Sequence, residues 1–161
     1  MAVEMFLRLD GITGGSRSYH HKGWSDLLSW RWGLDRAPGA DAALHMNEII
    51  LIKPVGMESS ALMTLFAERK LVKAAEIHVV PVVGKRDAQQ KYLALTLEGL
   101  LIKSIMTGGT AEDSVFSENI TCTFDKVKFE FNQYADAGPD GGAQKAESYI
   151  FGWDIAANKA W

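Results

Sequence analysis

Apolar and polar residues alternate with a period of two along most of the chain, which is the spacing of side chains on a β-strand. At the N-terminus, for example, Leu7 and Leu9 share one face, and Arg8 and Asp10 share the other. The pattern predicts strands over residues 3–9, 24–34, 48–53, 74–83, 91–106, 120–131 and 147–155. The chain is therefore expected to be mainly β.

Two of these segments change phase along their length. The apolar positions shift from odd to even numbers at Gly99, and from even to odd numbers near Asp125. A strand keeps its apolar side chains on one face only if the phase is constant, so each segment is expected to bend or to carry a bulge.

The spacing becomes helical at about residues 59–70, where Leu62, Leu65 and Phe66 recur at i, i+3 and i+4. One of the two serines that open this segment is expected to cap the helix. Turns are predicted at 84–87 and 136–142. The expected fold is an antiparallel β-barrel or two packed sheets with one α-helix, in a single domain over residues 1–161.

Length and composition add limits to this picture. With 161 residues, 47% of them apolar, the chain can bury a core without help from a metal or a disulfide. A net charge of −3 argues against a surface that binds nucleic acid. The single Cys122 excludes an intramolecular disulfide and favours folding in a reducing compartment. No signal peptide or membrane-spanning segment is recognised, so neither classical export nor membrane insertion is expected.

Groups that could carry chemistry are few, and none lies in a catalytic or metal-binding motif. Cys122 occupies an apolar position of the alternating pattern, so it is expected to be a core residue. His20 and His21 are interpreted as solvated loop residues. Glu76 and His78 could form an acid–base pair, or they could simply lie on an exposed polar face. No catalytic residue, cofactor or metal site is predicted. Many strand edges in one soluble chain instead favour self-association.

Five segments match a known family in order and spacing. They are MAVEMFLRL (1–9), SWRWG (29–33), TGG (107–109), ENITCTF (118–124) and GWDI (152–155). Taken together they resemble the haemolysin co-regulated protein (Hcp) family, the tube-forming, secreted component of the bacterial type VI secretion system. Two departures are Gly-Gly-Ser at 14–16, where the family often has Gly-Glu-Ser, and the cation Arg31 between two tryptophans.

The resemblance implies a tail-tube-like fold, a hexameric ring and stacking of rings into a tube whose lumen carries secreted effectors. It implies no enzymatic activity, no cofactor and no appended effector domain. The implied partners are further copies of the chain, type VI effectors, and sheath and spike or baseplate components. The implied location is the bacterial cytoplasm during assembly, followed by secretion to the exterior or into target cells. Alternatives are a phage-type tail-tube protein and a small β-barrel enzyme or ligand carrier.

Two groups of residues follow as candidate sites. The connection after the second strand is expected to reach a neighbouring subunit or ring. Ser29 and Arg31 are candidates for contact with cargo, because the tryptophans beside Arg31 share one face and direct it to the other. Six copies of Arg31 would form a basic belt suited to acidic cargo. The candidate residues of the connection are Asp35, Arg36, Ala37, Pro38, Gly39, Ala40, Asp41, His45 and Met46.

Overall fold

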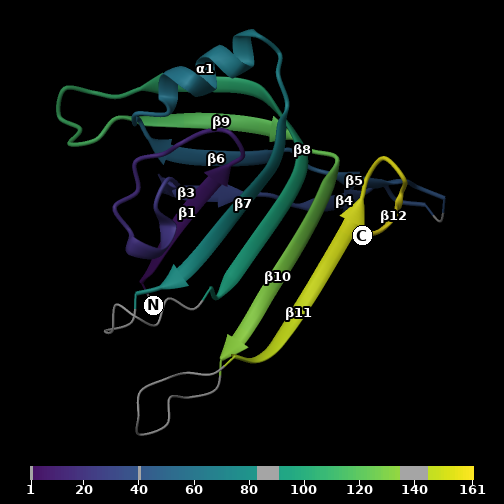
Figure 1. Ribbon diagram of the computed structural model, residues 1–161. Coiled ribbons are helices and arrows are strands. Elements are labelled where there is room, and N and C mark those ends of the chain that lie inside the picture. Colours follow the sequence, from purple (N-terminus) through teal and green to yellow (C-terminus); the bar gives the residue numbers. More distant parts are fainter. Residues whose placement is uncertain (1, 40, 83–90, 135–144) are drawn as a thin grey trace, which may run out of the picture.

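A computed structural model describes residues 2–39, 41–82, 91–134 and 145–161. It shows sheets packed around one core, with a single α-helix at their edge (Figure 1). The strands are β1 (Val3–Leu9), β2 (Ser25–Leu27), β3 (Ser29–Arg31), β4 (Leu34–Arg36), β5 (Leu44–Met46), β6 (Ile49–Pro54), β7 (Val72–Pro81), β8 (Leu93–Gly108), β9 (Ser117–Thr123), β10 (Lys126–Tyr134), β11 (Lys145–Asp154) and β12 (Lys159–Ala160). The helices are α1 (Ser59–Ala67) and the 3₁₀ helix η1 (Tyr19–His21). The prediction of a mainly β fold with one α-helix is confirmed. Of the two predicted arrangements, the described strands form open, packed sheets rather than a closed barrel.

All recorded strand pairs are antiparallel, and β8 belongs to two sheets. The larger sheet has the order β12-β11-β10-β8-β7-β1-β2, and the smaller has the order β3-β6-β9-β8. The first half of β8 pairs with β7 and β10, and the second half, from Leu101, pairs with β9. The bend begins at Gly99, whose φ is +65°, a conformation that favours glycine. The bend predicted at this glycine is therefore confirmed.

Two predicted strands are divided in the structure. Residues 120–131 form parts of β9 and β10, and the phase change near Asp125 is the corner where the chain passes from the smaller sheet to the larger one. Residues 24–34 were expected as one strand but form β2, β3 and the start of β4. The break between β2 and β3 falls at Leu28. Here the pairing partner changes, because β2 pairs with β1 and β3 pairs with β6, and the Leu28 amide already donates to the Ile52 carbonyl of β6 at 2.8 Å.

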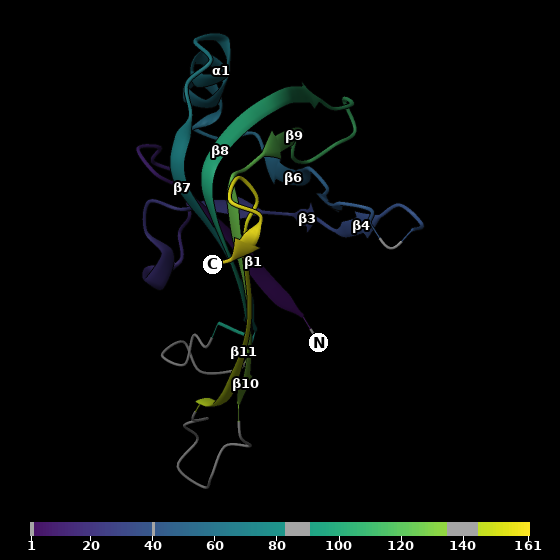
Figure 2. The same ribbon diagram turned by 90° about the vertical axis from the view of Figure 1, so that its right-hand side faces the viewer.

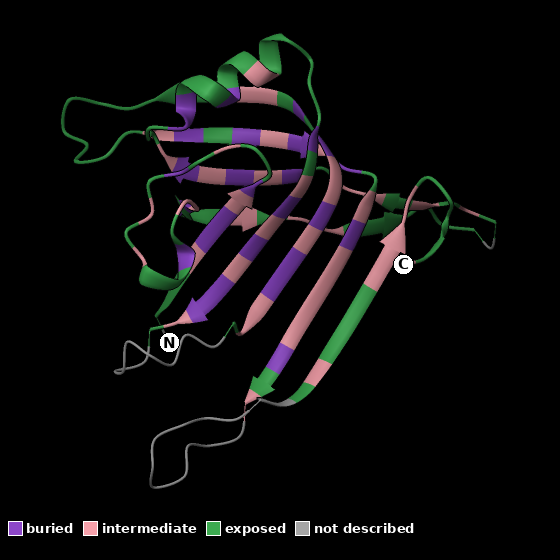
Figure 3. Cartoon of the chain, viewed as in Figure 1, coloured by how far each residue is buried: buried purple, intermediate pink, exposed green. Residues whose placement is uncertain are grey.

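The core lies between the sheets and under α1 (Figure 3). Trp30, Trp32 and Trp153 pack against it, as expected for core aromatics. Cys122 is fully buried, and burial raises the pKa of its thiol to about 12, so it is a core residue as predicted. The largest apolar side chains that are fully buried are Leu7, Ile49, Leu51, Leu62, Ile77, Leu95, Leu97, Leu100, Ile120 and Val72.

Helix α1 stands where it was predicted but ends three residues earlier, at Ala67. Arg69 adopts a φ of +58°, in the left-handed region, where an α-helix cannot continue. The helix starts without a side-chain cap on its amides; the Ser59 hydroxyl instead accepts a hydrogen bond from the Gly56 amide at 2.9 Å. No helix in the described ranges is long and apolar enough to cross a membrane. The turns predicted at 84–87 and 136–142 lie outside the described residues.

Candidate assembly surfaces

The smaller sheet has one face on the core and one face directed outward. Along β6, buried residues alternate with half-buried ones, of which Ile50 and Ile52 face away from the core. The register places Arg31 opposite Ile50 and Ser29 opposite Ile52, and both β3 residues are exposed. Trp30 between them packs against the core. The prediction that Arg31 points away from the tryptophan side is therefore confirmed, and Ser29 lies on the same outward face.

Neither margin of this sheet has a further strand paired to it in the part of the chain that the structure describes. β3 pairs with β6 on one side and has no described strand on the other. β8 beyond Leu101 pairs with β9 and with no other described strand. Unpaired strand edges are templates for pairing with another chain. The smaller sheet therefore offers a strand edge at β3, whereas at β8 the helix α1 lies beside the unpaired edge (Figure 1).

Near one end of the larger sheet, the edge of β11 that faces away from β10 is mostly unpaired. β12 covers it only at Trp153 and Asp154 among the described residues. Along the remainder of the strand Tyr149, Ile150 and Phe151 are exposed. Exposed apolar side chains on an open edge are a hazard for a soluble monomer, because they favour pairing with other chains.

The connection over residues 35–46 is more regular than predicted. Its base is a two-stranded ribbon in which β4 and β5 pair, with Asp35 opposite His45. Their side chains also meet, with His45 Nδ1 3.1 Å from Asp35 Oδ1. This hairpin, here called the arm (residues 34–46), projects away from both sheets (Figure 2).

The arm is solvated along most of its length. Met46 is half-buried against the core and anchors the base of the arm. Ala40 lies outside the described residues. The other candidate residues are all exposed: Asp35, Arg36, Ala37, Pro38, Gly39, Asp41 and His45.

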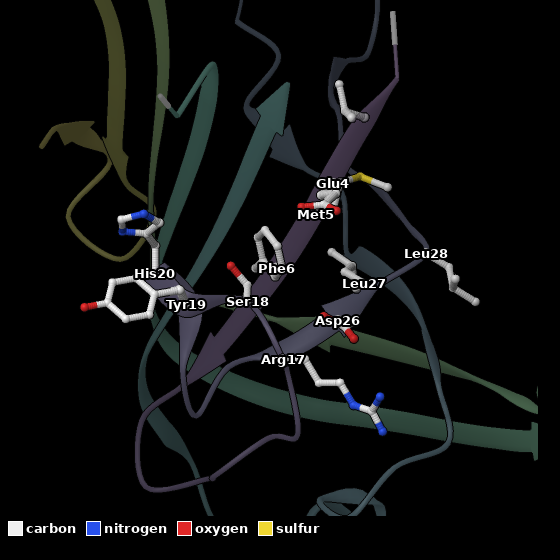
Figure 4. Close-up of a pocket in the computed structure, with 11 residues that line it drawn as sticks. Glu4, Met5, Phe6, Arg17, Ser18, Tyr19, His20, Asp26, Leu27 and Leu28 are labelled. Atoms are coloured by element: carbon white, nitrogen blue, oxygen red, sulfur yellow. The ribbon is translucent and has the colours of Figure 1, made fainter. Parts of the chain in front are cut away.

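A groove of about 810 Å³ lies beside the first half of β1 and the residues that lead into β3 (Figure 4). Its walls come from the first half of β1, from residues 17–20 and from residues 26–28. Leu28, which directly precedes β3, is half exposed in it. Arg17 and Asp26 line the same groove. The groove is therefore lined by both apolar and charged side chains.

Glu76 and His78 do form a pair, and the structure adds partners that the sequence did not indicate. His78 Nε2 lies 3.3 Å from Glu76 Oε2, and His78 Nδ1 lies 3.0 Å from His21 Nε2. Arg8 donates to Glu76 Oε1 at 2.7 Å. His21 is buried, so its interpretation as a solvated loop residue is wrong; His20 beside it is exposed, as expected.

Glu76 and His78 lie outside the groove, and the pKa values of both side chains are lowered. Burial lowers the pKa of His78 to about 4, and the charges of Lys91 and His21 act in the same direction, against Glu76. Burial alone would raise the pKa of Glu76, but the hydrogen bond and charge of Arg8 more than compensate, so it lies below its ordinary value. Neither His78 nor Glu76 lines the groove. The arrangement is that of a polar network under a loop.

A second polar cluster lies inside the fold. Lys53 is fully buried and its ammonium group contacts the carboxylates of Glu58 and Glu118. Sequence analysis did not single out these residues. The signal was present, because Lys53 falls on the same phase of β6 as the core residues Ile49 and Leu51. Among the described residues no three histidine, cysteine, aspartate or glutamate side chains are grouped as metal ligands.

Comparison with known proteins decides the family. The family profile described as "Type VI secretion system effector, Hcp" matches residues 6–131, which is most of the chain. The chain belongs to the Hcp family. The matched range includes the SWRWG, TGG and ENITCTF segments, and the resemblance seen in the sequence is confirmed.

Individual Hcp proteins are similar over their whole length. Protein hcp1 of Pseudomonas aeruginosa is 28% identical over 166 residues, covering 98% of each chain. The crystal structure of Hcp1 from Salmonella typhimurium covers both chains fully, with a TM-score of 0.79 and 24% identity. A structure described as a type six secretion system protein has a TM-score of 0.85 at 18% identity and covers 99% of this chain and all of its own. These structures support the Hcp fold.

Proposed function

We propose that this chain is the repeating subunit of a type VI inner tube, in which six copies close into a ring and rings stack into a tube. The observation that carries the proposal is that two strands of the smaller sheet lack a partner on one side, β3 and the second half of β8, of which only β8 has a helix, α1, beside it. A contact from one margin to the opposite margin of the next copy is heterologous, and it closes into a ring when the rotation allows.

In this ring the outward face of the smaller sheet lines the channel. That face carries Ser29 and Arg31, so six copies of Arg31 form a basic belt. The belt suits effectors with acidic surfaces, which we propose as the cargo. In this proposal the subunit forms the tube and carries effectors, with no catalytic step.

The arm makes the contact to a neighbouring subunit or to the next ring. It is long and exposed, and its base is fixed to the core by Met46. Contacts between rings repeat without closing, so a filament grows, and several weak contacts acting together suffice.

The proposal takes residues 1–161 as one tube domain whose other partners are the sheath and the spike or baseplate. Assembly takes place in the bacterial cytoplasm, and the type VI machine then secretes the subunit. A structure of similar fold, at 12% identity and a TM-score of 0.60, is described as "Secreted protein Hcp3 from Pseudomonas aeruginosa", which is consistent with a secreted subunit.

Sedimentation and negative-stain imaging of the purified protein test the proposal. Rings are expected at micromolar concentration, with stacked tubes at high concentration. Leu28→Asp places a charge beside the β3 margin and is expected to leave folded monomers. Leu28→Met is the matched control, because it keeps an exposed apolar side chain at the same position and should assemble as wild type does. Wild-type protein that stays monomeric across the micromolar range would overturn the proposal.

A further inference from the structure

Residues 11–24, here called the strap, cross the larger sheet on the side opposite the core. Within the strap, the Gly14 amide donates to the Gly23 carbonyl and the Ser16 amide donates to the Trp24 carbonyl, both at 2.8 Å. A Cβ atom on Gly14 would lie 2.4 Å from the Ser25 hydroxyl, so only glycine allows this close crossing. The strap is thus a closely packed loop laid against β1 and β7.

His21 fixes the strap to the sheet. Its ring stacks on Phe6 of β1 with centroids 4.0 Å apart, and its Nε2 lies 3.0 Å from Nδ1 of His78 on β7. Trp24 at the end of the strap packs on the His78 ring at 4.4 Å. His21 is buried, and the His78 side chain is only 14% exposed. The strap is therefore held by two histidine rings that are mostly withdrawn from water.

The neighbouring groups define which nitrogen donates. Arg8 holds Glu76, and an ionised carboxylate can only accept hydrogen bonds. His78 Nε2, at 3.3 Å from Glu76 Oε2, therefore carries the proton, and Nδ1 of the neutral ring is an acceptor. His21 Nε2 must then be the donor. The chain of hydrogen bonds is complete when His78 is neutral.

A proton on His78 Nδ1 disturbs this arrangement, because the acceptor becomes a donor. His21 then keeps the contact only by moving its own proton from Nε2 to Nδ1, towards Ser18 Oγ at 3.5 Å; otherwise two N–H groups face each other at 3.0 Å. The charged groups around the ring are Glu76 on its own strand, Arg8 on β1 and Lys91 just before β8, with His21 above. Glu76, which is also paired with Arg8, favours a charged His78 ring, but burial of the ring and the positive charge of Lys91 outweigh it. Release of the strap is the way to return the His78 ring to water.

We propose that the strap is an acid-released latch: uptake of a proton by the His21–His78 pair frees residues 11–24 from β1 and β7. The strap supplies residues 17–20 to the groove, so its release deforms the groove wall. The consequence for assembly rests on the proposed function, because Leu28 of the groove directly precedes β3, whose margin the proposed ring uses. In that case acid weakens the association of subunits.

Hydrogen exchange on the isolated subunit from pH 7.5 to 4 tests the latch itself. Burial depresses the pKa of His78 from 6.5 to about 4, so opening gains one proton between these values. The equilibrium constant for opening of the strap is then expected to rise about tenfold for each unit by which the pH falls in that window, after correction for the intrinsic exchange rate. Amides of residues 11–24 should lose protection while those of β7 and β8 retain it. Unchanged protection of the strap, or loss of protection throughout the core, would overturn the latch.

Matched variants separate titration from packing. In His21→Gln with His78→Asn, the side-chain nitrogen of Gln and the oxygen of Asn replace the Nε2 donor and the Nδ1 acceptor without a titrating ring. This variant, or His78→Asn alone, is expected to keep the strap protected at pH 5. His20→Asn removes the exposed neighbouring histidine and should behave as wild type. Release of the strap with the wild-type pH midpoint in the non-titrating variants would contradict the role of the pair.

Sedimentation over the same pH range tests the consequence for assembly. Rings of wild-type protein are expected to dissociate as the strap opens, and rings of His78→Asn are expected to persist. If rings survive at a pH where hydrogen exchange shows an open strap, the effect of the latch on assembly is overturned, but the latch itself still stands. Absence of rings at every pH would instead count against the proposed function, and the exchange data would still decide the latch.

Discussion

The ammonium group of Lys53 lies 2.7 Å from Glu118 Oε1, and both side chains are almost fully buried. Glu58 Oε1 lies 2.5 Å from the same ammonium group, and the Ser59 hydroxyl donates to Glu118 at 2.9 Å. Lys53 also donates to the Pro54 carbonyl at 2.6 Å. The cluster joins β6, β9 and the start of α1. Buried charges are tolerated only when they are paired and hydrogen-bonded in this way.

Lys53→Met should therefore destabilise the fold strongly, because it leaves Glu58 and Glu118 buried without a counter-charge. The expected loss in free energy of unfolding is about 3–5 kcal/mol, measured by urea denaturation at pH 7. Lys103→Met is the control, since Lys103 pairs with Glu48 on the surface and should lose less than about 1 kcal/mol. Equal losses in the two variants would contradict the account.

The same cluster predicts a pH dependence through Glu58. Burial raises its pKa, but the hydrogen bond and charge of Lys53, with help from Ser25, bring it below the ordinary value of 4.5. A lowered carboxyl pKa stabilises the fold above 4.5, and this stabilisation is lost as pH falls through the lowered pKa. The stability difference between wild type and Glu58→Gln should thus be constant from pH 6 to 8 and shrink below about 4.5. A difference that grows in acid would contradict this sign.

The bend of β8 offers a backbone test. Gly99 has a φ of +65°, and a Cβ there would lie 2.2 Å from Asp125 Oδ2. Gly99→Ala is expected to lower the free energy of unfolding by about 1–3 kcal/mol, because both the conformation and the contact are unfavourable. Gly108→Ala at the end of β8 should be nearly neutral, since its Cβ would meet nothing within 4 Å. Adding Asp125→Ala should recover only the part due to the contact.

The local pattern of the sequence predicts local structure here, and contacts between distant segments explain what it misses. Alternation predicted most strands, and the phase change at Gly99 predicted the bend, because both depend on neighbouring residues. The pairing of β8 with three strands depends on residues far apart in sequence, so its division between two sheets was not predictable. His21 and Arg8 reach their partners over separations of 57 and 68 residues. Their roles follow from the pairing of β1 with β7.

Shortening the arm tests its assembly role. Replacing residues 37–43 with a two-residue Asn-Gly turn lets β4 and β5 stay paired and leaves both sheets in place. Rings should still form, whereas stacked tubes should become rare because the contact to the next ring is lost. Asp35→Asn is the control, since it weakens only an exposed pair with His45. Tubes of normal length from the shortened protein, seen by negative stain, would exclude the arm from stacking.

Reversal of the charge at Arg31 tests the lining of the channel. If Arg31 faces the lumen, Arg31→Glu replaces a basic belt with an acidic one, and retention of an acidic cargo protein should fall severalfold while ring size stays the same. Retention by wild-type rings should also decrease with added salt, because exposed charges are screened. Lys73→Glu makes the same change in charge at an exposed site on β7 and should retain cargo as wild type does. Co-purification of cargo with each ring measures the effect, and equal retention by the two variants would exclude an electrostatic role for Arg31.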